Sequence, residues 1–200
     1  MEFNQNIHIC FLSLGEFELI RKESNIPDCV NALVDSRAIL IINFEAFLAA
    51  SCSKDFYPTI RHEAIHILLG QYSIYLPFWL EEGICEYYSR KHNIGYINRC
   101  LYGIKLMSFY EMNKEEIAYV SQLNSFNEIQ PYFYEQACSF VNFIINTISA
   151  NLFWYLIKHT SIRRDFFQVL QGITGKSLLE YQMEWEKSIN NYNVKNDWRY

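Results

Sequence analysis

The stretch from Pro58 to Gly70 constrains the fold of this chain more than any other part of the sequence. Proline is tolerated in the first turn of a helix and glycine often ends one, so this stretch is predicted to be helical. Apolar residues fall on most of the circumference of that helix, at Ile60, Ala64, Ile65, Ile67, Leu68 and Leu69. A helix that is apolar nearly all round is buried, so we expect it to lie centrally in the molecule.

The same predicted helix carries the pentapeptide His62-Glu63-Ala64-Ile65-His66. Residues four apart share one face of a helix, with Cβ atoms roughly 5–6 Å apart, so both imidazoles can reach one metal ion. Glu63 lies about 100° round the helix and can face a water molecule at the metal without being a ligand. The pattern is typical of a zinc hydrolase site whose glutamate is the general base, and a chance match is the competing explanation.

A second predicted helix, about Trp79 to Lys91, carries carboxylates that can complete a metal site. Two histidines and one glutamate are a standard ligand set for a catalytic zinc ion, which keeps a fourth position open. Glu82 is the expected third ligand, and Glu81, about 100° away round the helix, is the alternative. Glu86, one turn after Glu82, is either a hydrogen-bond partner for the free ring nitrogen of a ligating histidine or a solvated charge.

The rest of the sequence predicts an α+β fold in which a small sheet precedes a set of helices. Strands are predicted at residues 7–14, 29–34 and 38–44, and further helices at 16–23, 104–112, 115–123, 133–147, 151–159, 162–170 and 177–190. We expect one domain over residues 1–200. It would comprise a β-rich N-terminal lobe (1–53), the helices of the metal site (54–92) and a helical C-terminal lobe (93–200).

Composition and charge narrow the class of protein. Half of the residues are hydrophobic and the formal net charge is −5. A sizeable core is therefore expected, and nucleic-acid binding is not, because it requires a basic patch. The sequence does not predict the oligomeric state.

Two features bear on the expected location of the protein. The first residues carry no recognisable secretory signal, so we expect a cytoplasmic protein whose six cysteines are reduced. Residues 136–157 carry no charge and are long enough to cross a bilayer. Their asparagines, and the break at Ser149-Ala150-Asn151, favour two buried helices over a membrane span.

Several stretches resemble the gluzincin zinc metallopeptidases, in particular the peptidase MA-like domain family, which is related to the catalytic domain of zinc aminopeptidases. The two most specific stretches are His62-Glu63-x-x-His66 and Pro77-Phe78-Trp79-Leu80-x-Glu82-Gly83-Ile84-Cys85-x-Tyr87. A third stretch, Tyr134-Glu135-Gln136-Ala137-Cys138-Ser139-Phe140-Val141, is similar to a family segment whose tyrosine stabilises the oxyanion. Residues 175–185 resemble the closing segment of the family, so the resemblance spans about residues 55–190.

The resemblance implies a zincin-like fold, with a small N-terminal sheet packed on a mainly helical catalytic domain. It implies one zinc ion held by His62, His66 and Glu82. It further implies that Glu63 and Tyr134 act in the hydrolysis of a peptide bond, with a peptide or protein as substrate.

Two departures from the family pattern limit what the resemblance implies. Cys85 stands where the pattern has a small alanine, which favours packing over ligation. No G-x-M-E-N-like motif precedes His62, so aminopeptidase activity is not implied. The alternatives are a non-catalytic zinc-binding regulatory domain that retains the fold, and a helical protein whose motif is accidental.

Overall fold

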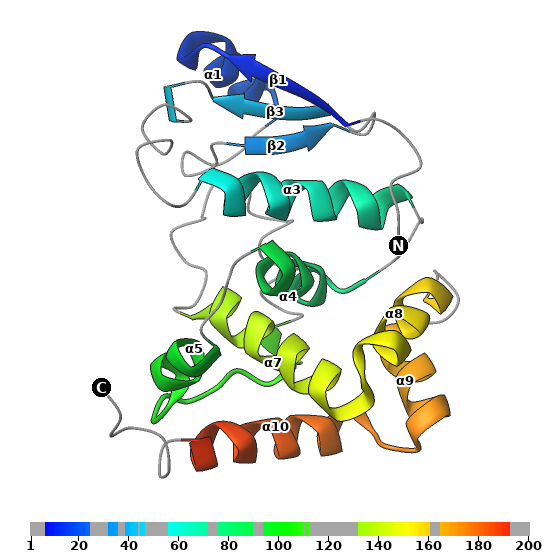
Figure 1. Cartoon of the computed structure of the whole chain (residues 1–200). Helices are drawn as coiled ribbons and strands as arrows, with labels where there is room; N and C mark the ends of the chain where they lie inside the picture. The colour runs from blue at the N-terminus through cyan, green and yellow to red at the C-terminus, as the bar shows by residue number, and fades with distance from the viewer. Residues whose placement is uncertain are drawn as a thin grey trace.

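The computed structural model describes residues 7–24, 32–35, 39–43, 45–46, 56–71, 76–89, 94–109, 111–112, 132–160 and 165–192. Within these residues the chain is mostly helical with one three-stranded sheet, so the predicted α+β fold class is confirmed (Figure 1). The strands are β1 (His8–Leu12), β2 (Ala32–Asp35) and β3 (Ile39–Asn43). The helices are α1 (Leu14–Glu23), α3 (Phe56–Gln71), α4 (Phe78–Ser89), α5 (Ile94–Leu101), α7 (Phe133–Ile148), α8 (Ala150–His159), α9 (Phe166–Thr174) and α10 (Leu178–Tyr192).

The sheet has the strand order β1-β3-β2 and presents one face to α3. Strand β1 runs parallel to β3, with His8 opposite Ile39, and β2 runs antiparallel to β3. Alternate residues of a strand point to the same face, and Leu40 and Ile42 of β3 are both buried against Ile67 of α3. The sheet therefore supports the helix that carries the two histidines.

Helix α3 lies between the sheet and α4, as its apolar circumference predicts (Figure 1). Ile60 and Ile67 join the small apolar cluster at the sheet. Ile65 and Leu69 instead join the large core on the other side of the helix. The helix is thus held from two sides, and this fixes the direction in which its polar side chains point.

The large core is rich in aromatic side chains and lies beneath α4, among α7, α9 and α10. Trp79 of α4 is fully buried and stacks on Phe109 and Phe167, with ring centroids 4.9 and 5.6 Å away. Gly83 of α4 faces α7 so closely that an added Cβ would lie 2.6 Å from the carbonyl oxygen of Ala137. Only glycine allows this approach of the two helix backbones, so the contact fixes α4 against α7.

Helices α7 and α8 are separated by a sharp break at Ser149, where the sequence predicts one. Ser149 has φ 77° and caps α8, since its Oγ accepts a hydrogen bond from the N–H of Leu152. The two helices are bent by 110° at this point. Within the described residues no single helix has the length and apolar character to cross a membrane; only the bent pair α7 and α8, taken together, meets these requirements.

Two predicted boundaries are wrong. Helix α1 begins at Leu14 rather than residue 16, because Ser13 and Glu16 form a reciprocal capping box at its N-terminus. Residues 104–108 are not helical, although a helix is predicted from 104 to 112. In this segment the N–H of Met107 donates to Oε1 of Gln136 at 2.7 Å, so a tertiary contact replaces a helical one.

Other predicted helices are found with shifted ends, and part of the prediction is untested. Helix α9 begins at Phe166, after Asp165, whose carboxylate accepts hydrogen bonds from the N–H groups of Phe167 and Gln168. Three parts of the prediction lie outside the described residues: the helix at 115–123, residues 162–164 of the helix at 162–170, and the end of the second metal-site helix after residue 89.

Candidate metal centre

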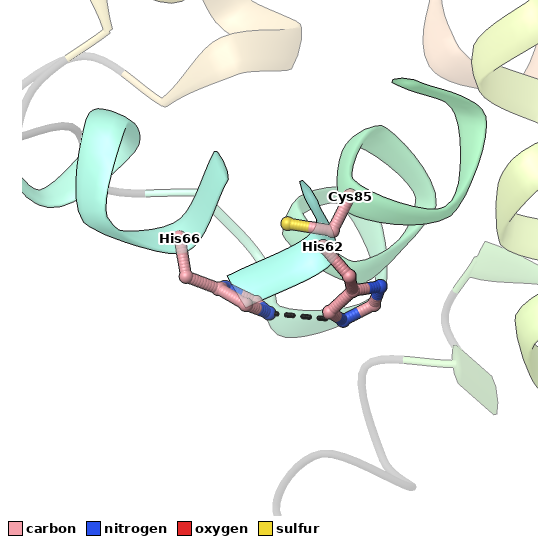
Figure 2. A group of neighbouring side chains, drawn as sticks. All are labelled: His62, His66 and Cys85. Atoms are coloured by element: carbon pink, nitrogen blue, oxygen red, sulfur yellow. Dashed lines mark hydrogen bonds between the residues drawn. The ribbon is translucent and has the colours of Figure 1, made fainter. Parts of the chain in front are cut away.

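Helix α3 directs His62 and His66 toward α4, side by side. Their ring centroids are 5.0 Å apart and their Nε2 atoms are 3.2 Å apart (Figure 2). This follows from the four-residue spacing, which places both side chains on one face of the helix. The two Nε2 atoms are therefore presented to one point in space.

Glu82 of α4 brings its carboxylate to the same point. Its Oε2 lies 3.2 Å from Nε2 of His62, and its Oε1 lies 3.5 Å from Nε2 of His66. A tetrahedral zinc ion with Zn–N and Zn–O distances of about 2.0–2.1 Å separates its ligand atoms by about 3.3–3.5 Å. The three side chains therefore already stand at the spacing that such an ion requires.

The outer ring nitrogens of both histidines face carboxylates. Nδ1 of His66 donates to Oε1 of Glu81 at 2.7 Å, and Nδ1 of His62 lies 3.3 Å from Oε1 of Glu86. An ionised carboxylate only accepts hydrogen bonds, so in neutral histidines both Nδ1 atoms carry the proton. Both Nε2 lone pairs then face each other and the Glu82 carboxylate. Three electron-rich atoms in this arrangement require a cation, or protons in its place.

The electrostatics of the site point the same way. Burial acts to lower the pKa of His62, but hydrogen bonds to Glu82 and Glu86 outweigh it and raise the pKa to about 10. Burial likewise opposes the effect of Glu81 and Glu82 on His66, whose pKa is also raised. Since both imidazoles are driven to take up a proton when no metal is considered, the site favours positive charge at this point.

Cys85 offers a second possible partner for the histidine pair. It is fully buried on α4, and its Sγ and one ligand atom of each histidine all lie within 4.8 Å of one another. Figure 2 shows Cys85 facing the two histidines, with its sulfur above the contact between the rings in this view. The group formed by His62, His66 and Cys85 could therefore hold a metal ion.

Two observations favour Glu82 over Cys85 as the third partner for zinc. The carboxylate oxygens of Glu82 are 3.2 and 3.5 Å from the Nε2 atoms, whereas the group with Cys85 spreads over up to 4.8 Å. Burial, together with the negative charge of Glu82, Glu81 and other nearby carboxylates, also raises the pKa of the Cys85 thiol well above its ordinary value. A neutral thiol is a poor metal ligand, so the nearer carboxylate is the better one.

The structure brings together four of the six predicted site residues by direct contact: His62, His66, Glu82 and Glu86. Glu63 lies on α3 between the histidines. Burial raises the pKa of its carboxyl group, while His66 and His62 act to lower it. Within the part of the chain that the structure describes, no hydrogen bond to the Glu63 carboxylate is found.

Tyr134 lies on α7, and Glu81 makes a contact that the sequence does not predict. Tyr134 is half-buried on α7, edge-on to Phe133 with ring centroids 5.4 Å apart, one turn before Ala137. Its role at the oxyanion stays a prediction. The sequence suggests Glu81 only as an alternative metal ligand. In the structure its carboxylate instead contacts Nδ1 of His66, the ring nitrogen that points away from the metal position. Its position directly before Glu82 is the signal that could have suggested this partner.

Comparison of the chain with protein-family models, with curated proteins and with solved structures finds no match.

Proposed function

We propose that this protein is a zinc-dependent peptidase of the gluzincin type with a zincin-like fold. In this proposal His62, His66 and Glu82 bind one zinc ion and Glu63 is the general base. The observation that carries the proposal is the convergence of two Nε2 atoms and one carboxylate at separations of 3.2–3.5 Å. Those separations match a tetrahedral zinc ion, and the set leaves a fourth position open, as catalytic zinc sites do.

The partners of the outer nitrogens support the same proposal. Metal-ligating histidines commonly donate their second N–H to a carboxylate, which fixes the tautomer and orients the ring. Glu81 faces His66 in this way and Glu86 faces His62. Each histidine thus has its own orienting carboxylate, and neither depends on solvent for its position.

The chemistry follows from the residues around the metal position. A bound zinc ion supplies Lewis-acid chemistry, because it polarises a carbonyl group and acidifies water to a pKa of about 7. Glu63 takes a proton from the water that attacks the peptide carbonyl, and later gives that proton to the leaving amine. Burial, which raises the pKa of Glu63, brings it nearer to the working pH of a general base.

Two further elements have proposed roles in binding the substrate. Tyr134 would donate a hydrogen bond to the oxyanion, and losing one such donor costs on the order of 10²–10³ in rate. Among the strands that the structure describes, β2 is at an edge of the sheet and packs near α3, so an extended peptide could add to this edge by strand pairing. The substrate is accordingly proposed to be a peptide or an extended segment of a protein.

The test compares wild type with Glu63→Gln, each loaded with zinc and incubated with a peptide library. Wild type is expected to cleave peptides, and Glu63→Gln to keep its zinc while losing about 10²–10⁴ in rate, because only the general base is removed. The matched control is Glu23→Gln, at an exposed residue at the end of α1, which should leave the rate unchanged. Full activity in Glu63→Gln would contradict the mechanism. Zinc binding without any cleavage by wild type would favour a non-catalytic regulatory domain instead.

A further inference from the structure

The sulfur of Cys85 is a metal-binding group that the proposed zinc site leaves unused. Cys85 is 0% exposed and is a free cysteine. It lies three residues after Glu82, so both side chains face α3 from the same side of α4. Two side chains of different chemistry therefore stand beside the same histidine pair.

The two possible third partners lie at different distances from the histidine pair. The oxygens of Glu82 stand 3.2 and 3.5 Å from the Nε2 atoms, which is the spacing for zinc. A zinc ion bound through sulfur at about 2.3 Å would need sulfur and nitrogen about 3.6 Å apart. The Sγ atom of Cys85 and one ligand atom of each histidine lie within 4.8 Å of one another, which is a looser limit than the distances found for Glu82.

The two partners also differ in chemical softness. Carboxylate oxygen prefers hard cations, whereas thiolate sulfur selects soft ones. The position of Cys85 is shielded from solvent, which protects a sulfur–metal bond from competing water. Softness and shielding from water thus both favour a soft cation at Cys85.

We propose that His62, His66 and Cys85 form a second ligand set, which binds a soft divalent cation. On binding, the Cys85 thiol loses its proton to solvent and the sulfur donates an electron pair to the cation, so neither an oxidant nor a reductant is required. The inference shares the two histidines with the proposed zinc site, but it does not require that site to be catalytic.

The experiment titrates the metal-free protein with Cd²⁺, which is larger and softer than Zn²⁺, and records the near-ultraviolet charge-transfer absorbance of a cadmium–thiolate bond. Wild type is expected to develop this band with one equivalent of Cd²⁺. Cys85→Ala should lose the band, and its Cd²⁺ affinity should fall by at least the 10–100-fold typical of lost supporting contacts. Its zinc affinity should not change, because zinc uses Glu82.

Controls separate Cys85 from the other cysteines and from misfolding. Cys138→Ala, at the other buried cysteine described, should keep the band. His62→Ala should lose it, because the histidine belongs to the same ligand set. Cys85→Ser keeps the size of the side chain and replaces the sulfur, so it serves if Cys85→Ala does not fold by circular dichroism.

The inference is overturned if wild type gives no cadmium–thiolate band, or if the band survives in the variant at position 85 or in His62→Ala. Its failure is distinguishable from failure of the proposed function. Zinc binding that depends on Glu82, without a cadmium–thiolate band, would leave the zinc site standing. A band that depends on Cys85, in a protein that cleaves no peptide, would support this inference and count against a peptidase.

Discussion

The two faces of helix α4 are built in opposite ways. Toward α7 the contact is apolar and close, with Gly83 against the backbone of Ala137. Toward α3 the contact is made by long acidic side chains, with Glu82 and Glu86 both reaching His62. Close-packed apolar contacts allow few alternative arrangements, whereas buried charged groups are stable only with partners. The difference indicates that the α7 face fixes the helix and the α3 face uses that fixed position to hold the carboxylates.

This division explains how four carboxylates can surround two histidines. Four carboxylates lie close together here: Glu63, Glu81, Glu82 and Glu86. Their mutual repulsion would drive α3 and α4 apart if the two helices were free to move. The contact between α4 and α7 keeps them together, and positive charge at the histidines offsets the repulsion. Metal sites depend on this kind of rigid support for their ligands.

The largest effect is expected on zinc affinity as a function of pH. Although burial lowers the pKa of His62, Glu82 and Glu86 raise it to about 10, so the metal-free protein keeps this proton at neutral pH. Zinc must displace it, and affinity should therefore fall about tenfold per unit as the pH falls from about 9 to 7. Chelator competition at fixed pH measures the affinity, and calorimetry in buffers of different ionisation enthalpy counts the released proton. An affinity that is independent of pH would contradict the role of His62.

The next largest effect on zinc affinity is expected from Glu81 and Glu86, whose carboxylates contact the Nδ1 atoms of the two histidines. Glu86→Ala and Glu81→Ala should each weaken zinc binding by about 10–100-fold, because the ring of His62 or His66 loses its orienting partner. Glu86→Gln and Glu81→Gln keep an oxygen that can accept the same hydrogen bond, so they should recover part of the affinity. Competition titrations on all four variants make the measurement. Equal affinities for the alanine variants and wild type would mean that these contacts do not support the site.

A smaller effect is expected at the apolar face of α4. Gly83→Ala introduces a Cβ that would lie 2.6 Å from the Ala137 oxygen and 3.0 Å from Cγ2 of Val141, so the helices must separate. Such overpacking typically lowers the free energy of unfolding by about 1–3 kcal/mol. Chemical denaturation measures this loss, and zinc affinity should fall with it because Glu82 moves with the helix. A stable variant with weakened zinc binding would show that the two faces are not coupled in the proposed way.

The smallest effect on the free energy of unfolding is expected for a glycine-to-alanine substitution on α3, at Gly70. An added Cβ at the exposed Gly70 meets nothing within 4 Å. Gly70→Ala should therefore raise the free energy of unfolding by up to about 1 kcal/mol, through helix propensity alone. Zinc affinity should stay as in wild type. Denaturation curves of the two alanine variants, measured side by side, separate the effect of close packing from that of propensity.

Local features of the sequence predict much of this structure. The helix with His62 and His66 is indicated by its proline, its glycine and its apolar positions, and the structure has α3 at that place. The helix with Glu82 follows from the same kind of reasoning. The spacing of residues along these helices decides which side chains share a face, so the sequence pairs His62 with His66 on one helix and Glu82 with Glu86 on the other.

Contacts between distant segments are the part that the sequence does not predict. The apolar pattern of β1 and β3 indicates two strands, but it does not say that they pair in parallel with β2 on the far side of β3. Residues 104–108 have a helical pattern, yet the buried contact of Met107 with Gln136 determines their conformation. The role of Glu81 depends on the separation of α3 and α4, which no local pattern encodes.

The most direct test of the central claim is the zinc content of the purified protein, measured by elemental analysis and by competition for zinc, in wild type and in Glu82→Ala. We expect one zinc ion per chain in wild type. We expect markedly weaker binding in Glu82→Ala, with the fold unchanged by circular dichroism. Wild type that binds no zinc, or Glu82→Ala that binds it as tightly as wild type, would contradict the proposal that His62, His66 and Glu82 form the metal site.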